Sequence, residues 1–281
     1  MMGDIKRVLA ATVAFYLVFF SSLATADHAW GKYKWSANSL PLLLDLVDNV
    51  DSGWDGHLLT ASGDWSVSSV LTTTAVPGST DPVTCSPELG NVQVCNAEYG
   101  DTGWLGIAQI YGRGTTITAG VAKLNDTYYN MPFYNTSAWR LMVMCQEVAH
   151  TFGLDHQDEI FNNNNLGTCM DYTDDPTGVT RGGLSNEHPN QHDYDQLVTI
   201  YAKEQKTGGG GSSDCNPKSP KCNPASAVDI ASLIQMEGPA QWGRLVSGHG
   251  AQEVYELDFG GGRRVITFVT WTLEHAEHHR H

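Results

Sequence analysis

Hydrophobic and polar positions follow two different periods along the chain, and these periods predict the secondary structure. An apolar run at 39–50 and alternating runs at 65–76, 103–112 and 115–125 predict four β-strands. A Gly-Arg-Gly turn joins the last two runs, which is typical of a β-hairpin. Between the first two strands, apolar side chains recur at helical spacing after a Ser52 cap: Trp54, Leu58, Ala61 and Trp65.

The strongest helical pattern covers 137–150, where Thr136 or Ser137 supplies the helix cap. A cysteine-bounded loop is predicted at 85–95, and a long polar loop follows the helix. Another helix is predicted near 191–204. The order of strand, helix, strands, helix, loop and helix predicts an α+β or α/β arrangement around one twisted sheet.

The N-terminal segment has the pattern of a secretion signal. Lys6 and Arg7 precede a short apolar run, and a triplet of small residues ends at Ala26. This order predicts a signal peptide at 1–26 that is cleaved after Ala26. The apolar run is short for a membrane span. We therefore expect a secreted, extracellular protein that has no membrane contact after cleavage.

A change of composition divides the rest of the chain into two units. Residues 205–226 are rich in Gly, Ser and Pro and have little apolar surface to bury, which predicts a linker. It separates one globular unit, 27–204, from a small module at 227–281. Alternating runs in this module predict a small antiparallel sheet with a charged tail. Such a module would bind substrate or a surface, or cap the larger unit.

Charge and cysteine content narrow the partners and the compartment. The net charge is −15, from 16 basic and 31 acidic residues, which argues against a nucleic-acid or anionic-membrane partner. We expect a monomer. An even number of cysteines in a secreted chain predicts disulfides, although sequence alone does not fix the connectivity. The six cysteines fall into three pairs that are close in sequence: Cys85 with Cys95, Cys145 with Cys169, and Cys215 with Cys222.

One short segment, CQEVAHTFGLDH at 145–156, has the spacing of a metal site. Gln146 and His150 lie one helical turn apart on one face of the predicted helix, with a glutamate beside them. A glycine at 153 can end the helix in a left-handed conformation and turn His156 back toward the same point. Three protein ligands and a water are what a catalytic zinc ion requires. The pattern predicts a zinc site.

This segment resembles the long zinc signature of the metzincin metalloproteases, H-E-x-x-H-x-x-G-x-x-H. Met170, in Thr-Cys-Met-Asp-Tyr, is similar to the methionine of the Met-turn in that clan. The resemblance covers roughly residues 30–204 and looks closest to the matrixins. It implies an α+β fold: a metzincin-like twisted sheet with an active-site helix, a Met-turn and a C-terminal helix, followed by the small β-rich module. A Cys145–Cys169 disulfide would fasten that helix to the Met-turn.

The departure from the signature is Gln146, which stands where the family has its first histidine. An amide oxygen is a weaker zinc ligand than an imidazole. Three explanations are open. Gln146 binds the metal through its side-chain oxygen; a distant group, Tyr172, His188 or His192, replaces it; or the metal is lost and the fold survives as a binding protein.

The resemblance implies a zinc endopeptidase that acts on polypeptides. Glu147 would be the general base, and Tyr172 would bind the metal or stabilise the oxyanion. A peptide would add as an extra strand along the edge provided by 103–125. The alternatives are a catalytically inactive binding protein and a hydrolase of another substrate class. Calcium is a weaker expectation, from the loop acids Asp155, Asp158, Glu159, Asp171, Asp174 and Asp175.

Overall fold

A computed structural model describes residues 28–201 and 238–278. The predicted signal peptide, the linker and the Cys215 and Cys222 pair lie outside the described residues. What the sequence predicts for these segments remains a prediction.

The described residues form one mixed sheet of nine strands, in the order β3-β2-β4-β6-β5-β9-β8-β7, with β1 pairing to β6 beside this path. β1 with β6, β2 with β3, β2 with β4, and β4 with β6 pair in parallel, whereas β5 with β6, β5 with β9, β8 with β9, and β7 with β8 pair antiparallel. The strands are β1 (Lys34–Trp35), β2 (Leu42–Asn49), β3 (Leu71–Pro77), β4 (Val92–Ala97), β5 (Trp104–Arg113), β6 (Thr116–Asn125), β7 (Arg244–His249), β8 (Gln252–Gly260) and β9 (Arg263–Trp271). The helices are α1 (Asp55–Trp65), α2 (Asp126–Tyr129), α3 (Ser137–His150), α4 (Gln191–Tyr201), α6 (Pro239–Trp242) and α7 (Leu273–His278).

The expected fold, a metzincin-like twisted sheet with an active-site helix, a Met-turn and a C-terminal helix, followed by a small β-rich module, is wrong. The sheet dominates the structure, and the strands on the two sides of the predicted linker belong to it together. The physical reason lies in β9, which is buried from Val265 to Trp271 and so needs strand neighbours on both edges. It finds β8 on one edge and β5 on the other.

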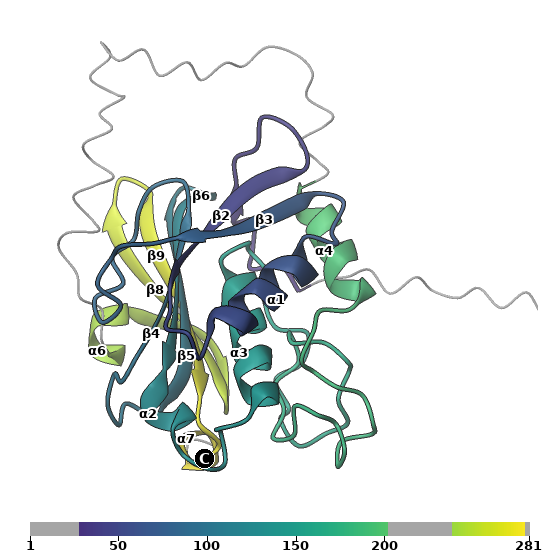
Figure 1. The fold of residues 1–281 in the computed structure, drawn as a ribbon. Coiled ribbons are helices and arrows are strands. Elements are labelled where there is room, and N and C mark those ends of the chain that lie inside the picture. Colours follow the sequence, from purple (N-terminus) through teal and green to yellow (C-terminus); the bar gives the residue numbers. More distant parts are fainter. Residues whose placement is uncertain (1–27, 202–237, 279–281) are drawn as a thin grey trace, which may run out of the picture.

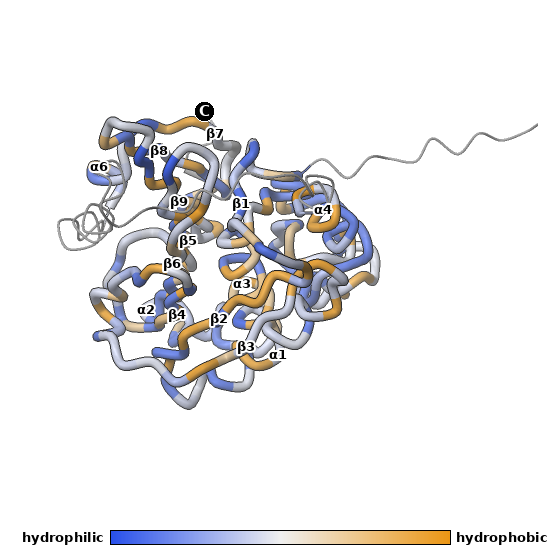
Figure 2. The backbone as a smooth tube through the Cα atoms, turned by 90° about the horizontal axis from the view of Figure 1, so that it is seen from above, coloured by the Kyte–Doolittle hydropathy of each residue, from blue (hydrophilic) through white to orange (hydrophobic). Residues whose placement is uncertain are grey.

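The sheet has a helical layer on one face and a smaller apolar cluster on the other. Figure 1 shows α1, α3 and α4 on one side of the sheet and α6 on the opposite side, and the view from above in Figure 2 agrees. Side chains alternate between these faces along each strand. On β9, Ile266 and Phe268 join the large core beneath the helices, whereas Val265, Val269 and Trp271 join the second cluster. The functional candidates all lie on the helical side.

Most local predictions agree with the structure, and the differences have local causes. Thr136 caps α3 by accepting a hydrogen bond from the Trp139 backbone N–H at 3.2 Å. The predicted Ser52 cap is wrong, because α1 begins at Asp55 and Trp54 precedes it without a side-chain cap. β3 begins at Leu71 rather than at 65, because α1 continues to Trp65 and a turn at 66–70 follows it. The loop predicted at 85–95 already contains the start of β4.

Two of the three predicted disulfides are present. Cys85 bonds to Cys95, and Cys145 bonds to Cys169, each pair with its Cα atoms 6.0 Å apart. The second bond joins α3 to the 168–172 segment, and such a cross-link typically stabilises a fold by about 2–4 kcal/mol. Disulfides of this kind are typical of proteins from oxidising compartments. No helix within 28–201 or 238–278 is long and apolar enough to span a membrane.

The glycine bend after α3 provides the first prediction. Gly153 has φ +93°, and a Cβ atom there would lie 2.3 Å from the Tyr33 carbonyl oxygen. Gly153→Ala should lower the free energy of unfolding by at least about 2 kcal/mol, from left-handed strain and this backbone clash. Urea denaturation measures the change.

Gly63 on α1 is the matched control, because a Cβ atom there meets nothing within 4 Å. Gly63→Ala should leave stability unchanged or raise it by roughly 0.5–1 kcal/mol, since alanine favours a helix. Equal losses for the two variants would contradict the role given to the bend.

Candidate metal centre

Helix α3 and the bend that follows it bring two histidines together, as the sequence predicts. His150 is the last residue of α3, and the Gly153 N–H donates to its carbonyl at 3.0 Å as the chain turns. The rings of His150 and His156 then lie with centroids 4.5 Å apart at 77° to one another. Two imidazoles that converge in this way are suited to a shared ligand.

His150 is fixed in the orientation that a metal ligand needs. Its Nδ1 donates to the Leu154 carbonyl at 2.9 Å, so Nε2 carries the free lone pair. That Nε2 atom is buried and has no hydrogen-bond partner. Burial lowers the pKa of His150 well below its ordinary value, with the neighbouring His156 as a further cause, so the ring is neutral. A neutral imidazole with an unpartnered lone pair is the form that binds metals.

His156 is nearly buried, at 8% exposure, and neither of its ring nitrogens has a hydrogen-bond partner. Its Nδ1 lies 3.6 Å from a carboxylate oxygen of Asp155 and 3.6 Å from one of Glu159. These three side chains form one of the clusters able to hold a cation among the described residues. His156 therefore has potential metal-binding neighbours on two sides.

Gln146, the residue that departs from the signature, is completely buried and already hydrogen-bonded. Its Nε2 donates to the Cys169 carbonyl at 3.0 Å. Its Oε1 lies 2.9 Å from the Thr270 hydroxyl and 3.3 Å from the Gln252 amide nitrogen, which donates to it. The oxygen proposed as a zinc ligand is thus in contact with β8 and β9.

Glu147 shares this polar network. Its Oε1 lies 2.5 Å from the Thr270 hydroxyl, and its Oε2 is buried without a partner. Burial raises the pKa of Glu147 to about 8, against a smaller opposing effect of the Thr270 hydrogen bond. The single proton of the Thr270 hydroxyl cannot serve Glu147 and Gln146 together. A protonated Glu147 that donates to Thr270, which then donates to Gln146, satisfies both contacts.

The remaining predicted residues lie in varied surroundings. Met170 and Tyr172 are fully buried. The Tyr172 hydroxyl donates to the Trp271 carbonyl on β9 at 2.7 Å, so it contacts the C-terminal strands. The Nδ1 atom of His188 lies 2.6 Å from a carboxylate oxygen of Asp64 on α1. His192 stacks on His28, with ring centroids 4.9 Å apart.

The C-terminal strands supply residues that the sequence analysis did not assign to the site. Phe268 stacks on the His150 ring with centroids 4.4 Å apart and planes 3° from parallel. Thr270 and Gln252 bond to Gln146, as described above. The alternating pattern predicted these strands, but nothing local indicated which edge they would join. The edge of β5 that was expected to accept a peptide is occupied by β9.

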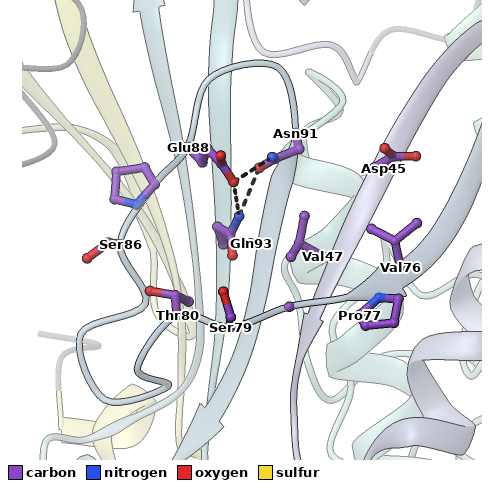
Figure 3. A pocket seen from close by; sticks show the side chains of 12 residues that line it. Asp45, Val47, Val76, Pro77, Ser79, Thr80, Ser86, Glu88, Asn91 and Gln93 are labelled. Atoms are coloured by element: carbon purple, nitrogen blue, oxygen red, sulfur yellow. Dashed lines mark hydrogen bonds between the residues drawn. The ribbon is translucent and has the colours of Figure 1, made fainter.

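The structure also contains an open pocket of about 550 Å³, away from these histidines. It lies between β2, β3 and the segment that leads into β4 (Figure 3). Its lining residues are Asp45, Val47, Val76, Pro77, Gly78, Ser79, Thr80, Ser86, Pro87, Glu88, Asn91 and Gln93. His150 is completely buried and His156 is 8% exposed, and neither of them lines this pocket.

Several acids of the loop considered for calcium are engaged within the loop. The Asp174 carboxylate pairs with Arg181, and Asp175 accepts hydrogen bonds from Thr177 and Thr180. Asp171 Oδ2 accepts from the Leu166 N–H at 2.7 Å. The calcium expectation stays a prediction.

The raised pKa of Glu147 leads to a second prediction, for the metal-free protein. Because the folded state holds this proton up to about pH 8 and the unfolded chain only to about 4.5, its contribution to stability is lost as pH rises between these values. The loss is at most about 1.4 kcal/mol per pH unit. Glu147→Gln removes it.

Urea denaturation from pH 5 to 8 with a chelator measures this contribution. Wild-type stability should decline relative to that of Glu147→Gln through the range, because other titrating groups are common to both proteins. Parallel stability curves for the two proteins would show that the carboxyl is not held protonated.

Comparison with known proteins adds no assignment to this geometry: no protein-family model matches the chain, and no curated protein matches its sequence. What the site does is therefore inferred from its own residues.

Proposed function

We propose that this chain is a secreted, zinc-dependent peptidase whose site is covered by its own C-terminal strands in the conformation described. The observation that carries the proposal is the Nε2 atom of His150, which is buried, unpartnered and held as a lone-pair donor beside the His156 ring. A buried polar atom without a partner is costly unless a ligand satisfies it. The signature-like segments at 146–156 and 168–172 support the proposal, and the fold does not.

His150 and His156 would hold the zinc ion, with the Gln146 carbonyl oxygen as the third protein ligand. Zinc would supply a Lewis acid that polarises a carbonyl and lowers the pKa of a water molecule. An amide oxygen is a weaker donor than imidazole, so we expect lower affinity than a three-histidine site would have. The Leu154 carbonyl, which accepts a hydrogen bond from His150 Nδ1, would hold His150 in the tautomer whose Nε2 can bind zinc.

Glu147 would take a proton from water and return it to the leaving amine. In the closed conformation it is unsuited to this role, because burial raises its pKa to about 8 and Thr270 contacts its Oε1 atom. Catalysis therefore requires β9 to move away from α3. The same displacement would free the Gln146 oxygen from its contacts with Thr270 and Gln252.

The edge of β5 would then be open to substrate. β9 pairs with β5 antiparallel from Trp104 opposite Trp271 to Arg113 opposite Arg263. A peptide bound in extended conformation would form the same kind of backbone ladder. The C-terminal strands would in this way act as an internal competitor of the polypeptide substrate.

A second candidate function, a non-catalytic binding protein, is favoured by the burial of the site. Gln146, Glu147 and His150 are completely inaccessible to solvent. The side chains of Thr270 and Phe268 contact Gln146 and His150, and so occupy the space that a substrate would need. In this case the buried residues would join α3 to the C-terminal strands and perform no chemistry.

Zinc content and peptide hydrolysis test the proposal and separate the two candidates. Purified full-length protein offered excess zinc should bind it stoichiometrically through His150, and cleave casein in a chelator-sensitive way. Gln146→His should tighten zinc binding by roughly tenfold or more, because imidazole is the stronger ligand. Glu147→Ala should keep the zinc and lose turnover.

His150→Ala, measured by the same methods, should lose the zinc held at this site. A preparation that binds no zinc through His150 would exclude the peptidase. Zinc binding without hydrolysis, in the wild type and in Thr270→Val, would favour the binding protein.

Weakening the cover should raise activity if β9 blocks the site. Thr270→Val keeps the shape of the side chain and removes its hydrogen bonds to Gln146 and Glu147. A loss of about 1.4 kcal/mol from the closed state corresponds to roughly tenfold more open protein, and hydrolysis should rise accordingly.

Thr267→Val is the matched control on the same strand. The Thr267 hydroxyl contacts Gln109 rather than the α3 site, so hydrolysis should stay near the wild-type rate. Equal rates for the two variants would show that the contacts of Thr270 do not limit access.

A further inference from the structure

A second group of metal-binding side chains lies at the beginning of α4, formed by His28, His192 and Asp193. One potential ligand atom of each residue lies within 4.8 Å of those of the other two. His28 is 5% exposed and Asp193 is completely buried. Distant parts of the chain therefore bring two imidazoles and a carboxylate to one point, beside but separate from the His150 site.

Three buried atoms of this group have no hydrogen-bond partner: His28 Nε2, His192 Nδ1 and Asp193 Oδ1. Unpartnered buried polar atoms are rare in folded proteins, and three at one point call for a common cause. The parallel rings of His28 and His192, with planes 14° apart, do not provide one, because stacking leaves ring nitrogens unsatisfied.

The contacts behind two of these atoms, His28 Nε2 and Asp193 Oδ1, make them electron-pair donors that face one another. His28 Nδ1 donates to the Asp155 carbonyl at 3.1 Å, which leaves a lone pair on Nε2. Asp193 Oδ2 accepts from the Thr168 hydroxyl at 2.5 Å and from the Asn190 N–H at 2.7 Å, which turns Oδ1 toward His28. His28 Nε2 and Asp193 Oδ1 are then 3.5 Å apart with no hydrogen bond between them.

Two lone pairs at this distance repel unless a proton or a metal cation lies between them, and no hydrogen bond joins the two atoms. Burial opposes a protonated imidazole, because it disfavours the charged form. A divalent cation satisfies both atoms. Two ligands about 2.05 Å from a tetrahedral zinc ion lie about 3.4 Å apart, close to the observed 3.5 Å.

We propose that His28, His192 and Asp193 form a zinc site that is distinct from the His150 site. Two imidazoles and one carboxylate are a favourable ligand set for zinc, with the fourth position left to water. The backing groups Asp155, Thr168 and Asn190 correspond to the hydrogen-bonding partners that orient metal ligands in proteins.

The role of this site is to connect elements. It would join His28, at the start of the described chain, to the first turn of α4, and through the Thr168 hydroxyl to the segment bonded to α3 by the Cys145–Cys169 disulfide. The same N-terminal segment pairs with the bend after α3, where Ala29 is bridged to Leu154. Zinc here would stabilise the fold around the His150 site without belonging to it.

Zinc stoichiometry of full-length variants tests the site independently of the proposed function. After equilibrium dialysis against zinc, His28→Ala and His192→Asn should each contain one equivalent less than wild type, by elemental analysis. His150→Ala should retain the equivalent held at the new site. His188→Ala is the control, because its imidazole is exposed and contacts Asp64; it should match the wild type.

A measurement on the wild-type chain guards against variants that fail to fold. Long-range ¹H–¹⁵N spectra of the histidine side chains, recorded during zinc titration, should show the ring signals of His28 and His192 shifting together. Unshifted signals, or wild-type zinc content in folded His28→Ala and His192→Asn, would overturn the proposal. If His150 binds no zinc but these two histidines do, the peptidase fails and the second site stands.

Discussion

The backbone pairing of β9 with β5 determines the surroundings of every candidate functional residue on α3. A strand edge carries unpaired N–H and C=O groups, and β9 satisfies those of β5 with its own. Because side chains alternate along a strand, this register turns Phe268 and Thr270 toward α3. A shift by one residue would turn Val269 and Trp271 there instead. Thr270 lies opposite Gly106, where a Cβ atom would come within 2.6 Å of Glu147, so the glycine permits the close approach of helix and sheet.

Apart from Glu147 Oε2, the polar side-chain atoms at this contact are hydrogen-bonded to one another, and these bonds hold β9 against α3. Gln146, Glu147, Gln252 and Thr270 are all completely buried. Removing one partner leaves another buried group without a hydrogen bond, which typically costs 1–3 kcal/mol. The proton retained by Glu147 belongs to the same network, because one threonine hydroxyl cannot donate to two acceptors. Charge, hydrogen bonding and strand register are thus coupled at a single residue of β9.

The parts of the structure that sequence predicted are those governed by local chemistry. The hairpin of β5 and β6, the Thr136 cap and the left-handed Gly153 each depend on residues within a few positions. Pairing between β5 and β9 depends on backbone groups far apart in the chain, and alternation alone does not specify a partner. The predicted fold is wrong because it lacks the pairing of β5 with β9, and without that pairing Thr270 could not be assigned to the site. His28 and Asp193 were missed for the same reason, since no short motif contains both.

The glutamine at position 146 is better suited to the closed arrangement than histidine would be. Its amide donates to the Cys169 carbonyl while its oxygen, with two lone pairs, accepts from Thr270 and Gln252. A neutral imidazole has one donor and one acceptor, so it would leave one of these contacts unmade. For zinc the preference is reversed, because imidazole is the stronger ligand. Glutamine at this position would therefore weaken the proposed zinc binding while it strengthens the contact between α3 and β9, so the two features that set this site apart have one chemical origin.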